Sequence, residues 1–177
     1  MKMIKRIRIR SYEAGFYFRE GEFMGLLGQG RYWFADPLNR VQVDVVSRRS
    51  PWIVHPDLDV LVRSKALDGR AEILDLKDHQ RALVWIDGRF DGVLEPGLHA
   101  LWKDLCDIRI EVVDASTVRF NHRWANVIAR WANVSQVFNV VTVDPGNAGV
   151  YFRDGEFSEV LQPGQYLFWK RVAKVKV

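Results

Sequence analysis

Residues 87–102 read Asp-Gly-Arg-Phe-Asp-Gly-Val-Leu-Glu-Pro-Gly-Leu-His-Ala-Leu-Trp, and the same pattern occurs three times in the chain. The glycine that follows the first acidic residue recurs every 67 residues, as Gly21, Gly88 and Gly155. A second glycine keeps the same spacing, as Gly30, Gly97 and Gly164. A fixed period of this length indicates an internal repeat, in which each copy forms one small structural unit.

The repeated pattern contains two kinds of turn. An acidic residue followed by glycine, between runs of β-forming residues, predicts a tight hairpin turn, because glycine accepts the positive φ that such a turn needs. The later Pro-Gly pair predicts a type II turn with glycine at the left-handed position. The first copy has Gln-Gly there and keeps only the glycine. The candidate turn residues are Gly21, Gly30, Asp87, Gly88, Pro96, Gly97, Asp154, Gly155, Pro163 and Gly164.

Apolar and polar residues alternate between the turns, as in Val41-Gln42-Val43-Asp44-Val45 and its copy at 108–112. This alternation predicts antiparallel strands with one buried face and one wet face. The segments 58–63 and 124–131 are also interpreted as strands, because neither shows helical periodicity over more than a turn or two. We therefore predict an all-β chain of tandem small antiparallel units with a period of about 67 residues. The units are residues 1–72, 73–139 and 140–177, and the third is incomplete.

The composition is that of an ordinary globular protein. A chain of 177 residues with 48% hydrophobic residues can bury a real core. The single cysteine, Cys106, excludes an intramolecular disulfide and is interpreted as a packed, inert thiol. There is no apolar run long enough to span a bilayer and no signal-peptide pattern. We therefore expect a cytoplasmic protein, or one that lies at the inner face of a membrane.

The first strand is basic. Lys5, Arg6, Arg8 and Arg10 surround Ile7 and Ile9, so alternation places the isoleucines on one face and three arginines on the other. One period later the apolar positions are kept, but Asp75 and Lys77 replace two of the arginines. A solvated strand face is the simpler interpretation, and a contact surface for phosphates or lipid headgroups is the alternative. The net charge of +4 is compatible with both.

No catalytic, cofactor or metal signature is found in the sequence. His55 and His122 occupy equivalent positions and are interpreted as turn or packing residues, because no second metal-ligating residue was found to recur beside them at ligand spacing. Acidic residues occur singly, chiefly in turns and on wet strand faces. The glycines of Gly25-Leu26-Leu27-Gly28-Gln29-Gly30 make turns and do not cradle a phosphate, because no helix pattern follows them. We expect no enzyme activity, no cofactor and no metal.

Three segments of the third copy carry a family resemblance: Gly149-Val150-Tyr151-Phe152-Arg153-Asp154-Gly155-Glu156-Phe157, Val160-Leu161-Gln162-Pro163-Gly164-Gln165-Tyr166, and Val175-Lys176-Val177. Together they resemble the start of a stomatin/prohibitin/flotillin (SPFH, band 7) domain. The tandem arrangement is similar to the units that precede this domain in bacterial slipins and, more remotely, to the repeats of the major vault protein. The resemblance implies a scaffold that assembles into larger oligomers.

Two functions are therefore carried forward from the sequence. The first is a non-enzymatic structural or scaffold module that self-assembles or binds another protein, because repeat units offer extended edges. The second is a basic module that binds nucleic acid or anionic lipid. We expect a homo-oligomer or a protein partner and at most a peripheral membrane contact. Nucleic acid is the less favoured partner, because the repeated aromatic residues occupy positions typical of a core and not of exposed stacking platforms.

Overall fold

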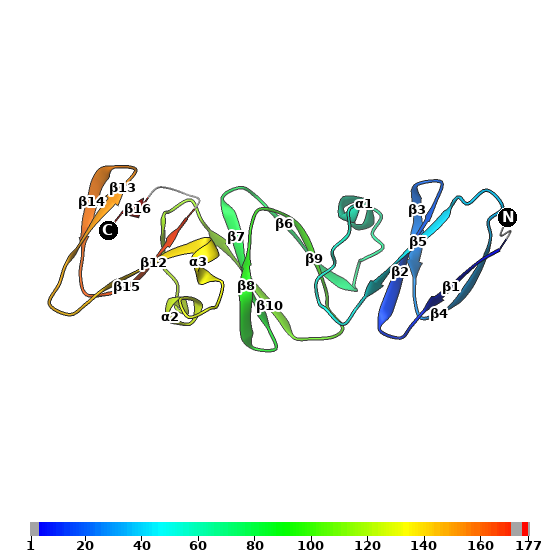
Figure 1. Cartoon of the computed structure of the whole chain (residues 1–177), viewed down its shortest axis with the longest axis horizontal. Coiled ribbons are helices and arrows are strands. Elements are labelled where there is room, and N and C mark those ends of the chain that lie inside the picture. The colour runs from blue at the N-terminus through cyan, green and yellow to red at the C-terminus, as the bar shows by residue number, and fades with distance from the viewer. Residues whose placement is uncertain (1–3, 171–174, 177) are drawn as a thin grey trace. The chain divides into compact units, whose positions relative to one another are not determined.

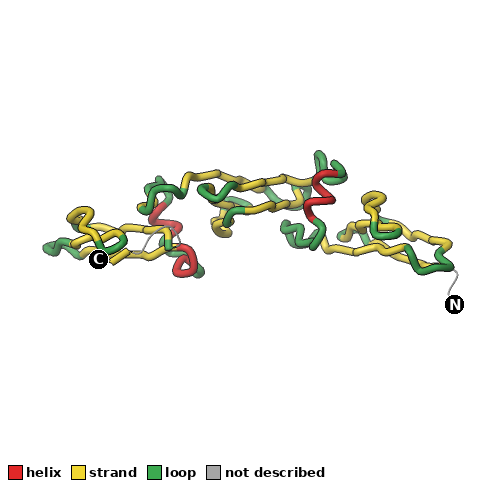
Figure 2. Tube along the Cα trace, turned by 90° about the horizontal axis from the view of Figure 1, so that it is seen from above, coloured by secondary structure: helices red, strands yellow, loops and turns green. Residues whose placement is uncertain are grey.

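The computed structural model describes residues 4–170 and 175–176, and strands make up most of them (Figures 1 and 2). The first copy of the repeat contains β1 (Ile4–Ile9), β2 (Glu13–Arg19), β3 (Glu22–Leu27), β4 (Gly30–Ala35), β5 (Val41–Ser47) and α1 (Leu58–Arg63). The second contains β6 (Ala71–Leu76), β7 (Gln80–Ile86), β8 (Arg89–Leu94), β9 (Gly97–Trp102), β10 (Ile108–Asp114), β11 (Arg119–Phe120), α2 (Ala125–Ile128) and α3 (Val134–Val137). The third contains β12 (Phe138–Val143), β13 (Gly149–Arg153), β14 (Glu156–Leu161), β15 (Gly164–Trp169) and β16 (Val175–Lys176).

The prediction of an all-β chain built from small antiparallel sheets is confirmed. Each copy forms two kinds of sheet. The first strand pairs with the fourth, as β1 with β4 and β6 with β9, and we call this pair the ribbon. The second, third and fifth strands form a three-stranded sheet, with strand orders β3-β2-β5, β10-β7-β8 and β14-β13-β16. In the third copy the ribbon gains a strand and has the order β11-β15-β12.

The hairpins repeat in detail. The residues before and at the turn glycine both have positive φ, as in a type I′ turn: 56° and 85° at Glu20 and Gly21, 50° and 75° at Asp87 and Gly88, and 52° and 92° at Asp154 and Gly155. The pairing register also shifts at the same step of each hairpin. These shifts lie at Tyr17/Phe18, Val84/Trp85 and Tyr151/Phe152. The local geometry is therefore copied together with the sequence.

The second turn differs from the prediction. Gly97 and Gly164 have φ of 130° and 156°, far from the value of about 80° in a type II turn, and Gly30 has no positive φ at all. Pro96 and Pro163 each lie in a bend directly before these glycines. The bend does not close a hairpin, because the strands on its two sides belong to different sheets. It carries the chain from the three-stranded sheet to the ribbon.

Short helices replace two of the expected strands. Residues 58–63 form α1, and the segment 124–131 contains α2, so the strand interpretation of both is wrong. Their equivalent residues Leu61 and Ile128 are fully buried. A side chain also satisfies a backbone N–H at each helix start, since Nδ1 of His55 accepts from Asp57 and Nδ1 of His122 accepts from Trp124. In a strand, these backbone N–H groups would instead donate to a neighbouring strand.

The largest cores join a sheet to the ribbon encoded after it. In the first, Phe16 and Phe18 of β2 pack with Leu61 of α1 and with Trp102 of β9. The rings of Phe16 and Trp102 are stacked, with centroids 6.4 Å apart. In the second, the equivalent Leu83 and Trp85 of β7 pack with Ile128, Phe138 and Trp169. A third, smaller cluster contains Val118, Val143, Tyr151, Leu161 and Phe168.

The chain forms two compact units. The first consists of residues 1–75 and 98–107, and the second of residues 76–97 and 108–177. The boundaries predicted near residues 72 and 139 separate successive copies of the 67-residue repeat in the sequence. The compact units do not follow them, because the first unit takes most of β9 from the second copy of the repeat.

Candidate functional site: the basic ribbon and the exposed sheet face

The β1–β4 ribbon carries the predicted basic residues on its outer face. Arg6 lies opposite Trp33 and Arg8 lies opposite Arg31 in the antiparallel register, so the four side chains share one face. All four residues are exposed, and the exposed fraction of Trp33 is 62%. The guanidinium carbon of Arg6 lies 5.0 Å from the centroid of the Trp33 ring, which is a cation–π contact. This face therefore combines positive charge with an accessible aromatic ring.

Lys5 does not belong to this surface. It alternates to the other side of β1 from Arg6 and is only half exposed. Its Nζ donates to the carbonyl oxygen of Val41 at 2.5 Å. The sequence grouped Lys5 with the three arginines, whereas the structure gives it a role in holding β1 near the start of β5.

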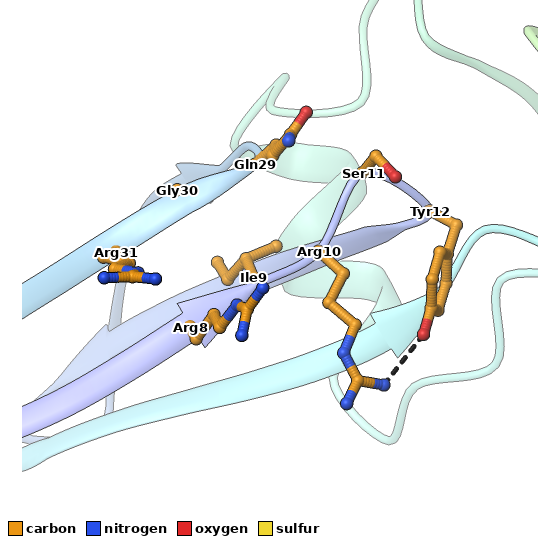
Figure 3. A pocket seen from close by; sticks show the side chains of 8 residues that line it. All are labelled: Arg8, Ile9, Arg10, Ser11, Tyr12, Gln29, Gly30 and Arg31. Atoms are coloured by element: carbon orange, nitrogen blue, oxygen red, sulfur yellow. Dashed lines mark hydrogen bonds between the residues drawn. The ribbon is translucent and has the colours of Figure 1, made fainter.

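A pocket of about 440 Å³ lies at the end of the ribbon (Figure 3). Its lining residues come from β1, from the loop after β1, from the loop before β4, and from β4 itself. They are Arg8, Ile9, Arg10, Ser11, Tyr12, Gln29, Gly30 and Arg31. Arg10 is oriented by Tyr12, whose hydroxyl accepts a hydrogen bond from Nη1 at 2.8 Å, and by Glu13 at 3.7 Å. The hydrogen bond to Tyr12 raises the pKa of the Arg10 guanidinium, and the nearby charge of Glu13 adds a smaller increase. Three cationic groups therefore border one small pocket.

The sheet β14-β13-β16 exposes apolar residues that are core residues elsewhere in the chain. Val150, Phe157 and Val160 have exposed fractions of 44%, 60% and 49%. One and two periods earlier, Leu83 and Phe16 stand at the position of Val150 and are fully buried. The residues equivalent to Phe157 and Val160 pack against the two large cores: Phe23, Leu26, Phe90 and Val93. We call Val150, Phe152, Phe157 and Val160 the exposed sheet face.

The two equivalent histidines each contact a carboxylate. Nε2 of His55 lies 3.3 Å from Oδ2 of Asp44, and Nε2 of His122 lies 3.0 Å from Oε1 of Glu111. The hydrogen bond from His122 lowers the pKa of Glu111. Asp44 and Glu111 are themselves equivalent, so a carboxylate does recur with the histidine, eleven residues before it. This pair was not predicted from the sequence, although both of its members recur at the 67-residue period.

Each pair is too small to hold a metal by itself. Among the residues that the structure describes, no group of three or more histidine, cysteine or acidic side chains could hold an ion. Both histidines also contact aromatic rings, as in the stacking of His55 on Phe18 with centroids 5.7 Å apart. Their geometry is that of a packed residue that bonds a helix start on one side and a strand carboxylate on the other.

The remaining predicted residues are dispersed. Asp87, Asp154 and the hairpin glycines lie at separate hairpin tips, and Pro96 and Pro163 lie in the bends between sheets. Cys106 is half-buried. None of the helices in the described part of the chain has the length and apolar character needed to cross a bilayer. No family model, no curated protein and no solved structure matches the chain.

Proposed function

We propose that the chain is a non-enzymatic structural module that self-associates head to tail. In this arrangement the exposed sheet face of one copy accepts the β1–β4 ribbon of a second copy. The observation that carries the proposal is the exposure of Val150, Phe157 and Val160, whose equivalents pack into cores in both other copies of the repeat. The resemblance to slipin-type SPFH proteins extends the proposal to a cytoplasmic scaffold built from many copies.

The chain itself supplies the template for this contact. Within the first compact unit, the sheet β3-β2-β5 packs against the β6–β9 ribbon through Phe16 and Trp102. The β1–β4 ribbon exposes the matching positions. Ile4 stands where Ala71 and Phe138 are buried, and Trp33 stands where Ala100 and Leu167 are buried. One chain therefore presents both halves of a contact that it makes internally between other copies of the repeat.

Such a contact is heterologous, because the two surfaces that meet are different. Heterologous contacts extend into filaments or close into rings, and they do not stop at a dimer unless geometry forces closure. Apolar side chains of this size, when exposed together, commonly mark an interaction site. Turn chemistry accounts for the acidic hairpin tips, and packing accounts for the single cysteine.

The proposal is tested by light scattering after size exclusion over a range of protein concentrations. The native chain should increase in mean mass with concentration, and Phe157→Glu and Trp33→Glu should each remain monomeric, because each places a charge in an apolar contact. Met24→Glu is the matched control, since Met24 is 55% exposed on β3 and lies outside both surfaces. It should behave as the native chain does.

A mixing experiment separates head-to-tail association from general stickiness. The Phe157→Glu chain keeps an intact ribbon, and the Trp33→Glu chain keeps an intact sheet face. An equimolar mixture should therefore form a dimer that neither variant forms alone. A native chain that is monomeric throughout, or a mixture that stays monomeric, would contradict the proposal.

A further inference from the structure

The pocket at the end of the β1–β4 ribbon places two arginines in direct opposition. Arg8 on β1 and Arg31 on β4 are cross-strand partners, so their side chains leave the same face at neighbouring positions. Figure 3 shows them on facing strands at the pocket, with Arg10 turned toward Tyr12. Like charges directly opposite each other destabilise a strand pair. In the part of the chain that the structure describes, neither Arg8 nor Arg31 has an acidic partner.

The repeat shows that the fold does not need these arginines. The positions of Arg8 and Arg31 are filled by Asp75 and Leu98 in the second copy of the repeat and by Thr142 and Gln165 in the third. The β6–β9 and β12–β15 strand pairs therefore form with at most one charged residue at these two positions. The paired arginines of the first copy therefore carry an electrostatic cost that the other two copies avoid, and a bound anion would offset it.

The groups around the pocket suit one class of anion. Arginine presents a planar fork of N–H donors that matches phosphate oxygens, and paired arginines can bind two sides of a tetrahedral phosphate. Arg10 adds a third cation, which Tyr12 and Glu13 hold in place. Ser11, Gln29 and the Tyr12 hydroxyl also line the pocket and can hydrogen-bond polar atoms beyond the phosphate. The volume of about 440 Å³ exceeds that of a phosphate ion and leaves room for an esterified group.

We propose that this pocket binds the phosphate group of a phosphate ester, held between Arg8 and Arg31 with Arg10 at its border. The ester is either a free phosphorylated small molecule or a lipid headgroup, since the pocket chemistry is common to both. The site is distinct from the head-to-tail contact. That contact uses the Ile4 and Trp33 end of the ribbon, and the positions equivalent to Arg8 stay exposed in the second and third copies of the repeat, at Asp75 and Thr142.

The first measurement is calorimetric titration of the full chain with inorganic pyrophosphate at low and at physiological salt. Arg8→Ser/Arg31→Ser should bind roughly ten- to hundredfold more weakly, as expected when hydrogen bonds to a charged group are lost. Arg19→Ser/Arg89→Ser removes the same charge from exposed strand positions outside the pocket and should bind as the native chain does. Higher salt should weaken binding by the native chain, because the arginines are exposed.

The second measurement distinguishes the source of the phosphate. Vesicles of phosphatidylcholine, with and without phosphatidic acid, are sedimented with the native chain and with both double variants. Co-sedimentation that needs phosphatidic acid and is lost in Arg8→Ser/Arg31→Ser assigns a lipid headgroup. Pyrophosphate binding without co-sedimentation assigns a free ester.

Three outcomes overturn the proposal. One is a native chain that binds neither pyrophosphate nor phosphatidic acid vesicles at low salt. Another is that both double variants weaken pyrophosphate binding equally. The third is that the native chain binds a single-stranded oligonucleotide more tightly than pyrophosphate, with the two double variants weakening that binding equally, because diffuse charge attraction would then explain the affinity. A monomeric native chain in the light-scattering experiment would contradict only the proposed self-association. The phosphate measurements test the pocket independently of it.

Discussion

Nε2 of His122 lies 3.0 Å from Oε1 of Glu111, and the ring binds the start of α2 through its other nitrogen. Because Nδ1 accepts the backbone N–H of Trp124, the ring proton is on Nε2 and is donated to the carboxylate. The side chain is 9% exposed and stacks on Phe120 with centroids 5.6 Å apart. One side chain thus connects a strand, a helix start and the core.

Replacing this histidine should destabilise the second compact unit. We expect His122→Ala to lower the free energy of unfolding by about 1–3 kcal/mol, since two hydrogen bonds and a ring contact are lost from a buried site. Urea denaturation followed by tryptophan fluorescence measures the change. His79→Ala is the control, because His79 is exposed, and it should change little. Equal stability of the two variants would show that the His122–Glu111 pair contributes nothing.

The same pair predicts a dependence of stability on pH. The hydrogen bond from His122 lowers the pKa of Glu111 below its ordinary value of 4.5, with smaller contributions from neighbouring cations. A carboxyl group with a lowered pKa in the folded state contributes stability above its unfolded pKa and loses it as the pH falls through the folded value. We expect the native chain to lose stability more steeply than Glu111→Gln between about pH 5 and pH 3. Parallel pH profiles of the two chains would contradict the assignment.

The hairpin turns allow a test of backbone strain. Gly88 has φ of 75°, in a region that side chains rarely adopt, and a Cβ added there would meet no neighbouring atom. Gly88→Ala should therefore cost about 1 kcal/mol through backbone strain alone. Gly28→Ala is matched in surroundings, with nothing within 4 Å, but has no positive φ. Chemical denaturation should show a loss only for Gly88→Ala.

Equivalent phenylalanines should differ in their contribution to stability. Phe90 contacts the rings of Trp85 and Trp131 at 5.4 and 5.6 Å, whereas Phe157 contacts Phe152 at 6.2 Å and is 60% exposed. We expect Phe90→Ser to cost about 2 kcal/mol or more and Phe157→Ser less than about 1 kcal/mol. Unfolding is measured at protein concentrations where the chain is monomeric. A similar cost at both sites would show that Phe157 is covered in the single chain.

Features set by neighbouring residues could be predicted from the sequence. The acidic-Gly pairs specify their own hairpin turns through backbone sterics, and alternation identified the strands on either side. The pairing of β1 with β4 could not be predicted in this way, because the two strands are separated by another hairpin and no local signal selects the partner. The opposition of Arg8 and Arg31 depends on that pairing and its register, so the pocket was not predicted.

The helices and the histidine contacts were missed for different reasons. The start of α1, Leu58-Asp59-Val60-Leu61, alternates apolar and polar residues well enough to predict a strand. A helix of six residues is too short for its period of 3.6 to be distinguished from the period of 2 of a strand. The carboxylate partner of each histidine lies eleven residues earlier, on β5 or β10, whereas the histidines lie in loops, so no local turn pattern links the two. Comparing the copies with each other would have shown that Asp44 and Glu111 recur with the histidines.

The offset between the sequence period and the cores limits how the chain can be divided. Because Phe16 needs Trp102 from the next copy, a fragment cut at residue 72 separates a sheet from the ribbon that covers it. Because the sheet and the ribbon of one core are encoded in successive copies of the repeat, a fragment that keeps the first core whole must run from β2 through β9.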